Sequence, residues 1–502
     1  MNTLLRRHCP MLAMACLMCL VLQAPEARAD AWNATNNPER FQIDLQYDLA
    51  AMPVLGAADQ IPWTLGYPPK YGDEPGLSTL VKFDQAVYDW GDVGIGNPDQ
   101  LGPAAGSDYD ISRQAQPVLG LDSNLPDPLE DRWGLYHGWA AAAVMEPEPI
   151  SSVTYNGYGF TADDVKALAI RLYDQAPSDV VGAPCPEDVI PSDDPLGSHG
   201  VCQDINAGAF FVVLTNMLGK YKRGLPEGGD PGPGVFTRIA SDYQIVEDRP
   251  LTEDEAVAIL GHPGSRYGDL TGSPDSVKWY RIKMKVGYIT ESSNTTSHTE
   301  EYELILELNG DGDVIGGEWA GRSVYSHPDF VWIPTSVAQT NSYLTTHDVD
   351  QLIESAKDGP RMTSKLAAHV DVVARATATL AERTETYDPA DLPPEISDNL
   401  LRAADSASEA LDDSIFLLLD ADDASGHERR VLGLRAAARL RHAMAQIRAF
   451  EAQVHGGMNG RHPRIAEEAG LGLMAYSEQL IELGNGIADV VVDMAHSESR
   501  GG

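Results

Sequence analysis

Residues 131–143 read Asp-Arg-Trp-Gly-Leu-Tyr-His-Gly-Trp-Ala-Ala-Ala-Ala, and Glu-Pro-Glu-Pro follows at 146–149. The apolar, alanine-rich part predicts a buried helix. Tyr136 and His137 stand between two tryptophans at its start. A helix N-terminus lowers the pKa of a nucleophile, and a buried helix fixes its position. The stretch therefore suits a nucleophile-bearing helix, although composition alone favours aromatic side chains that simply pack the first turn.

The surrounding residues 125–345 have the pattern of a mixed α/β domain. Thr161 and Asp164 form a capping box, which predicts the start of a helix. Residues 210–214 are a continuous apolar run and predict a buried strand. Alternating residues and an Asn-Gly-Asp-Gly turn predict an antiparallel sheet built from segments 278–290, 301–308 and 314–315.

The last part of the chain, residues 346–502, is poor in aromatic residues and rich in Ala, Leu, Arg and Glu. Helical patterns cover residues 362–384, 394–421, 427–455 and 463–496. The third carries one apolar stripe, formed by Ala437, Leu440, Met444, Ile447 and Val454. We therefore predict an antiparallel helical bundle. Such a stripe is usually core, so it indicates no partner.

The beginning of the chain has the order of a cleavable export signal. Arg6 and Arg7 precede an apolar run at 11–22, and Ala27-Arg-Ala29 gives a small-x-small site, which predicts cleavage after Ala29. The apolar run is too short to span a membrane, and no later stretch is long enough. We expect a periplasmic or secreted protein that does not span the membrane.

Charge and cysteine content limit the partners and the chemistry. The formal net charge is −39, which argues against nucleic acid and anionic membranes as partners. Outside the signal the only cysteines are Cys185 and Cys202. An exported chain favours a disulfide between them, and a reactive thiol is the alternative. Motifs for phosphate-binding loops, zinc proteases and redox pairs are absent from the sequence, and we expect no cofactor or metal.

Several motifs, in order, resemble those of the transglutaminase elicitors, cell-wall proteins of oomycetes with bacterial relatives. The family segment reads W-x-G-x-C-H-x-W-x-x-A-A, then E-P-E-P, and Trp133, His137 and Trp139 fit it. Residues 202–210 resemble the family's C-R-D-x-N-P-G-x-F. Further matching segments are 213–216, 219–220, 316–319 and 327–330.

The resemblance implies a papain-like transglutaminase core, in which a cysteine thiolate attacks a glutamine carboxamide and a lysine amine takes the acyl group. This sequence differs from the family at the residues that carry out the reaction. Tyr136 stands at the family's cysteine position, and Phe211 stands where the family has histidine. The expected acid falls near Gly228, with Glu227 and Asp230 beside it.

These departures predict a catalytically degenerate transglutaminase-like protein that binds a protein substrate or ligand. His137 could act as a base near Tyr136, oriented by Asp204 or Asn206. The alternatives are an active acyltransferase with a non-standard site, and a structural envelope protein that works through the helical tail.

The predicted fold class is α+β, with these parts: a signal at 1–29, a loop-rich segment at 30–115, the core at 116–345 and the helical bundle at 346–502.

Overall fold

The computed structural model describes residues 32, 34–64, 74–91, 98–108, 135–183, 204–228, 237–260, 276–290, 298–338, 340–358, 362–460 and 463–497. The export signal, Trp133, Cys185 and Cys202 lie outside these residues, so the predicted signal and disulfide remain predictions. Among the described residues, no helix has the length and apolar character needed to cross a membrane.

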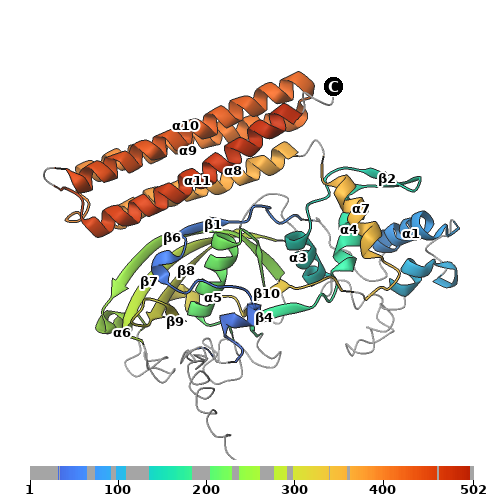
Figure 1. Ribbon diagram of the computed structural model, residues 1–502, viewed down its shortest axis with the longest axis horizontal. Helices are drawn as coiled ribbons and strands as arrows, with labels where there is room; N and C mark the ends of the chain where they lie inside the picture. The colour runs from blue at the N-terminus through green and yellow to red at the C-terminus, as the bar shows by residue number, and fades with distance from the viewer. Residues whose placement is uncertain are drawn as a thin grey trace, which may run out of the picture.

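A curled antiparallel sheet of eight strands forms the centre of the molecule (Figure 1). Its order is β4-β10-β5-β6-β7-β8-β9, and β1 pairs with β6 outside this path. The strands are β1 (Leu55–Ala57), β4 (Ser178–Gly182), β5 (Leu225–Gly228), β6 (Thr237–Leu251), β7 (Lys278–Ile289), β8 (His298–Leu308), β9 (Val314–Trp319) and β10 (Phe330–Pro334). A separate hairpin pairs β2 (Val153–Tyr155) with β3 (Tyr158–Phe160).

The β7–β8–β9 meander confirms the sheet predicted from alternating residues. Asn309 fixes the turn into β9, because its side-chain oxygen accepts the backbone N–H groups of residues 311–313 at 2.9–3.0 Å. Gly312 adopts φ +97, a conformation that glycine tolerates without strain. In this turn the Asn309 side chain therefore provides the hydrogen-bond acceptor for the backbone N–H groups.

Helices pack against both faces and one end of this sheet (Figure 1). A short buried helix, α5, lies in its concave side. At the β10 end of the sheet lie α3, α4 and α7, with α1 outermost (Figure 1). The helices of this core are α1 (Glu74–Tyr88), α3 (Tyr136–Met145), α4 (Ala162–Leu172), α5 (Ala207–Leu214), α6 (Glu253–Leu260) and α7 (Thr346–Ala356). The capping box at the start of α4 is confirmed, whereas α1 interrupts the segment predicted to be loop-rich.

The strand predicted at 210–214 is wrong, because these residues belong to α5. Asn206 caps this helix by accepting the N–H groups of Gly208 and Ala209. All eight residues of α5 are buried between the sheet and the N-terminal segment. A helix buried on every side carries no amphipathic period, so its short apolar run looks the same as a buried strand.

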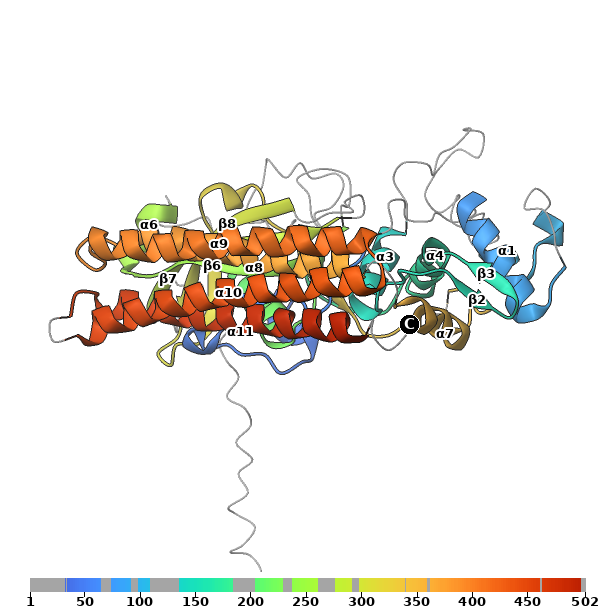
Figure 2. The same ribbon diagram turned by 90° about the horizontal axis from the view of Figure 1, so that it is seen from above.

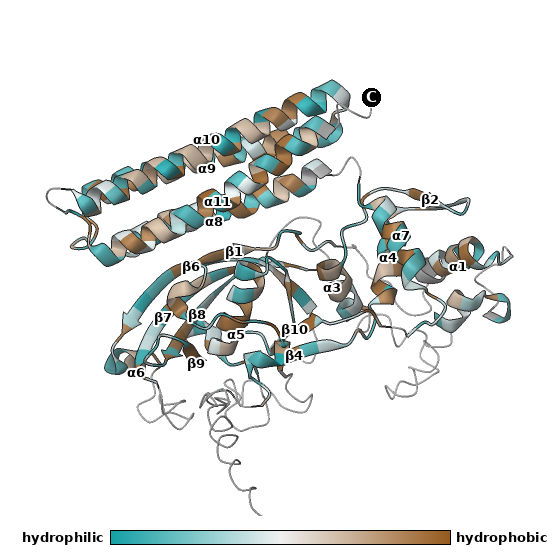
Figure 3. Cartoon of the chain, in the orientation of Figure 1, coloured by the Kyte–Doolittle hydropathy of each residue, from teal (hydrophilic) through white to brown (hydrophobic). Residues whose placement is uncertain are grey.

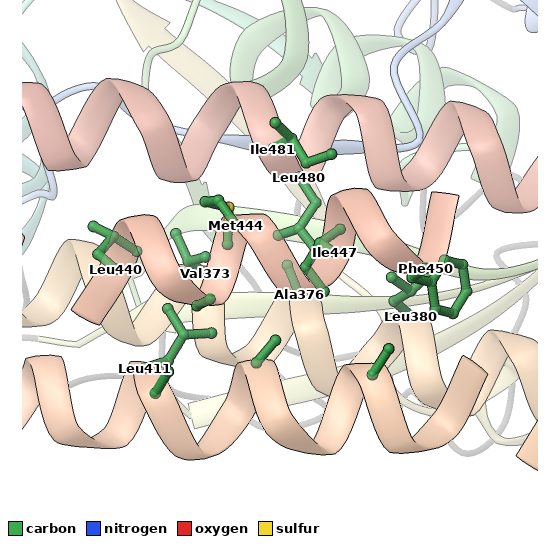
Figure 4. Packing of buried hydrophobic residues seen from close by; sticks show 14 of the residues in the cluster. Val373, Ala376, Leu380, Leu411, Leu440, Met444, Ile447, Phe450, Leu480 and Ile481 are labelled. Atoms are coloured by element: carbon green, nitrogen blue, oxygen red, sulfur yellow. The ribbon is translucent and has the colours of Figure 1, made fainter. Parts of the chain in front are cut away.

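The C-terminal helices form the predicted antiparallel bundle (Figures 1 and 2). They are α8 (Met362–Thr386), α9 (Pro394–Asp423), α10 (Gly426–Asn459) and α11 (Glu467–Ser497). The stripe predicted on α10 is buried, and its Leu440, Met444 and Ile447 meet Leu411 and Leu480 of neighbouring helices (Figure 4). Apolar residues line the inside of the bundle, and polar ones predominate outside (Figure 3).

The bundle is docked on the convex side of the sheet through polar contacts. Arg375 of α8 pairs with the buried Asp242 of β6 at 2.8 Å. The side-chain oxygen of Gln479 on α11 accepts the backbone N–H of Val54 at 3.0 Å. Lys365 of α8 lies 3.2 Å from Glu148. The helices that face the core are therefore α8 and α11, and α9 and α10 form the outer layer.

Candidate active site

The site begins with α3, whose residues 138–143 are all buried. Trp139 anchors the helix, because its fully buried indole donates to the carbonyl of Trp63 at 2.8 Å. A Cβ atom on Gly138 would lie 2.6 Å from the carbonyl oxygen of Ile170 on α4. Glycine at this position therefore allows the start of α3 to approach the end of α4.

This close approach brings His137 to Asp174, which lies two residues after the end of α4. The imidazole Nε2 and the carboxylate Oδ1 are 2.6 Å apart. The histidine side chain is 48% exposed, whereas that of the aspartate is 1% exposed. One ring nitrogen of His137 is thus held by a buried carboxylate, while much of the ring faces solvent.

Burial controls the protonation of this pair. It raises the pKa of Asp174 to about 7, although the N–H of Gln175 opposes the rise. Burial also lowers the pKa of His137, which favours the neutral imidazole. Both shifts favour the uncharged forms of the two groups. A histidine beside a buried carboxyl group supplies two of the three members of a nucleophile–histidine–acid arrangement.

Residues 129–358 match a family model described as transglutaminase elicitor. This part of the chain is therefore similar to the transglutaminase elicitors. The chain is also similar to the crystal structure of the GP42 transglutaminase from Phytophthora sojae, with 21% sequence identity and a TM-score of 0.48, over 65% of this chain and 99% of that chain. No curated protein matches the chain. The elicitor match ends before α8, so the bundle lies outside it.

Within the matched residues, Tyr136 is the first residue of α3 and is half-buried. It precedes His137 directly, and neighbouring side chains on a helix point about 100° apart. The hydrogen-bonding partner of His137 is Asp174, which lies just after the end of α4, and sequence reasoning missed it. No motif marks Asp174, since its role depends on how α3 packs on α4.

The structure groups the other predicted site residues around α5. Asp204 lies 3.7 Å from His327, Asn206 caps the helix, and Phe211 is fully buried against the sheet. Phe211 and Trp139 belong to separate hydrophobic clusters. The structure thus keeps His137 with Asp174, and keeps Asp204 with His327.

Motif residues that the sequence analysis quoted without a role also meet beside α5. The indole of Trp319 stacks on His327, with ring centroids 4.9 Å apart, and donates to the carbonyl of Ile205 at 3.0 Å. Phe210 lies against Trp319, with ring centroids 5.3 Å apart. These contacts join three separate family-like segments into one packed cluster.

Glu227, near the position expected for the family's acid, is buried in a neighbouring polar network. Arg238 forms an ion pair with it, and the Tyr288 hydroxyl donates to it at 3.1 Å. Arg238 also donates to the Tyr302 hydroxyl at 2.7 Å. Burial raises the pKa of Glu227 even so. The carboxylate is committed to this network, which cross-links β5, β6, β7 and β8.

Proposed function

We propose that this chain is an exported transglutaminase-like protein that is catalytically degenerate and binds a glutamine-bearing protein chain near His137. The observation that carries the proposal is the orientation of α3. A histidine and its carboxylate are in place, but the residue that corresponds to the nucleophile is Tyr136, on the adjacent helical position.

The chemistry supports this proposal. A phenol has an unperturbed pKa of about 10, above the value of about 8.5 for a thiol, and is a weak nucleophile toward an amide. Because successive helical side chains diverge by about 100°, His137 is poorly directed to take a proton from Tyr136. Loss of one member of such a triad typically lowers the rate by several orders of magnitude.

A second candidate is residual acyl transfer at the same site. It is favoured by the 2.6 Å contact between His137 and Asp174, because a solvent-facing imidazole with an orienting carboxylate can act as a general base. In that case a non-standard nucleophile would take the place of the thiol.

Two assays on the chain from Asp30 onward separate these candidates. The first measures incorporation of a labelled primary amine into a glutamine-rich acceptor protein. We expect none from the wild type, from Tyr136→Phe or from Tyr136→Cys, because a thiol at 136 would still lack a well-directed base. Incorporation that disappears in Tyr136→Phe would overturn the proposal and make Tyr136 a catalytic nucleophile.

The second assay measures binding of a fluorescent glutamine-rich peptide by anisotropy. We expect His137→Ala to weaken binding, whereas His442→Ala, an exposed histidine on α10, leaves it unchanged. Equal affinity in both variants would remove the His137 region as the binding site.

A further inference from the structure

The outer layer of the bundle exposes large apolar side chains near the α9–α10 turn. Phe416 is 66% exposed, Leu419 is 45% exposed, and Val431 on α10 is 39% exposed. The Ser414 hydroxyl donates to the carbonyl of Ala436 at 3.0 Å. This contact sets the antiparallel register of α9 and α10, so Leu419 and Val431 lie at the same level along the bundle. Phe416 and Leu419 are three residues apart on one side of α9, and we call them the α9 face together with the carboxylates described next.

Carboxylates surround the aromatic ring on the same side of α9. With about 100° per residue, positions 405, 409, 412, 416, 420 and 423 fall within one stripe. All of them except Phe416 are acidic, and all are exposed. Residues 403–423 contain no lysine or arginine. Phe416 thus lies in the middle of an anionic stripe.

The α9 face is directed away from the rest of the chain. The bundle contacts the core through α8 and α11, on its opposite side (Figure 1). The interior of the bundle is already filled by its own apolar stripes (Figure 4). Helix stability does not require a phenylalanine at an exposed position, where it has lower helix propensity than alanine. An apolar side chain within a polar rim is instead typical of an interaction site.

Charge decides which kind of partner fits. Anionic surfaces are repelled by the acidic stripe, and the chain carries a net charge of −39. A symmetric pair of chains joined through this face would place two acidic stripes against each other, which costs energy. A segment with an apolar side and lysine or arginine flanks would bury Phe416 and pair with its rim.

We propose that the α9 face is a docking surface for a cationic amphipathic helix of a partner protein, with Phe416 as its anchor. The apolar side of that helix covers Phe416 and Leu419. Its basic side chains meet Asp412, Asp420 and Asp423. This role is independent of the site at His137, which lies on α3.

The probe for this proposal is a synthetic amphipathic helix of about 15 residues, made of leucine and lysine at helical spacing. Its binding to the chain from Asp30 onward is measured by fluorescence anisotropy. We expect Phe416→Ser to weaken binding about tenfold or more, as for the loss of an aromatic anchor. Neutralising the rim with Asp412→Asn and Asp420→Asn should weaken binding and reduce its salt dependence.

The matched control is Leu471→Ser on α11, where the leucine is 54% exposed. It should leave the affinity unchanged, and a peptide of the same composition in scrambled order should bind at least tenfold more weakly. Equal affinities for Phe416→Ser and Leu471→Ser, or for the two peptides, would overturn the proposal. Self-association of the wild type that Phe416→Ser abolishes would also overturn it, because the partner would then be a second copy.

Discussion

Replacing Arg375 with methionine should destabilise the whole chain, because Arg375 is the charged partner of a carboxylate in the interface between bundle and sheet. Asp242 is fully buried and lies 2.8 Å from Arg375. Its remaining donors are neutral: the Ser241 hydroxyl at 2.9 Å and the Gln244 amide at 2.7 Å. Gly287 leaves the space that this carboxylate occupies. The variant therefore buries a charge without its counter-charge, at a cost of about 3–5 kcal/mol.

Urea unfolding measures this cost with two probes. The tryptophans all precede residue 346, so their fluorescence reports the core, whereas far-UV circular dichroism is dominated by the bundle. We expect both transitions of Arg375→Met to move to lower urea, since the pair joins the two parts. The control is Arg441→Met, which breaks an exposed pair of 2.8 Å with Asp489 and should cost less than about 1 kcal/mol.

Adding Asp242→Asn tests the reason for the loss. Without a charge at 242, Arg375→Met should recover at least half of the lost free energy of unfolding, because the two residues are directly coupled. The reasoning is refuted if Arg375→Met is no less stable than Arg441→Met, or if Asp242→Asn brings no recovery.

Two further predictions concern α3 and its neighbour. Asp174 has a folded-state pKa of about 7, well above its value of about 3.9 when unfolded, so the folded chain binds the extra proton and stability falls as pH rises from about 4 to 7. In Asp174→Asn this loss of unfolding free energy between about pH 4 and pH 7 should be smaller by about 2–4 kcal/mol, as measured by urea unfolding at both pH values. An equal pH dependence of stability in the variant and the wild type would contradict the prediction. Gly138→Ala should cost about 1–3 kcal/mol, because the added carbon meets the Ile170 carbonyl oxygen at 2.6 Å. Gly486→Ala on α11, where the added carbon meets nothing within 4 Å, should be neutral or stabilising in the same assay.

The bundle could be predicted from sequence because its physics is local. Apolar residues at spacings of three and four, broken by proline and glycine, specify where amphipathic helices begin and end. The predicted helix at 394–421 differs from α9 by two residues at one end. The capping box of α4 and the turn before β9 were predictable for the same reason, since the deciding contacts join residues close in sequence.

The misassigned α5 and the overlooked Asp174 share a different cause. The eight residues of α5 are helical because the curled sheet encloses them and Asn206 caps them, and neither fact appears in their own apolar pattern. The contact between His137 and Asp174 requires two helices to meet at Gly138. Both features depend on tertiary packing, which overrides local signals in short segments.

The position of β10 has a consequence for the order of assembly. β10 lies between β4 and β5, and β4 has no other partner among the described strands. β4, which follows the α3–α4 unit in the chain, is therefore paired into the sheet only after synthesis has passed Pro334. Until then the edges of β4 and β5 are open to wrong partners. A nascent or cleaved chain that ends before Phe330 would have every residue of the His137 pair but would lack the strand that pairs β4 with the rest of the sheet.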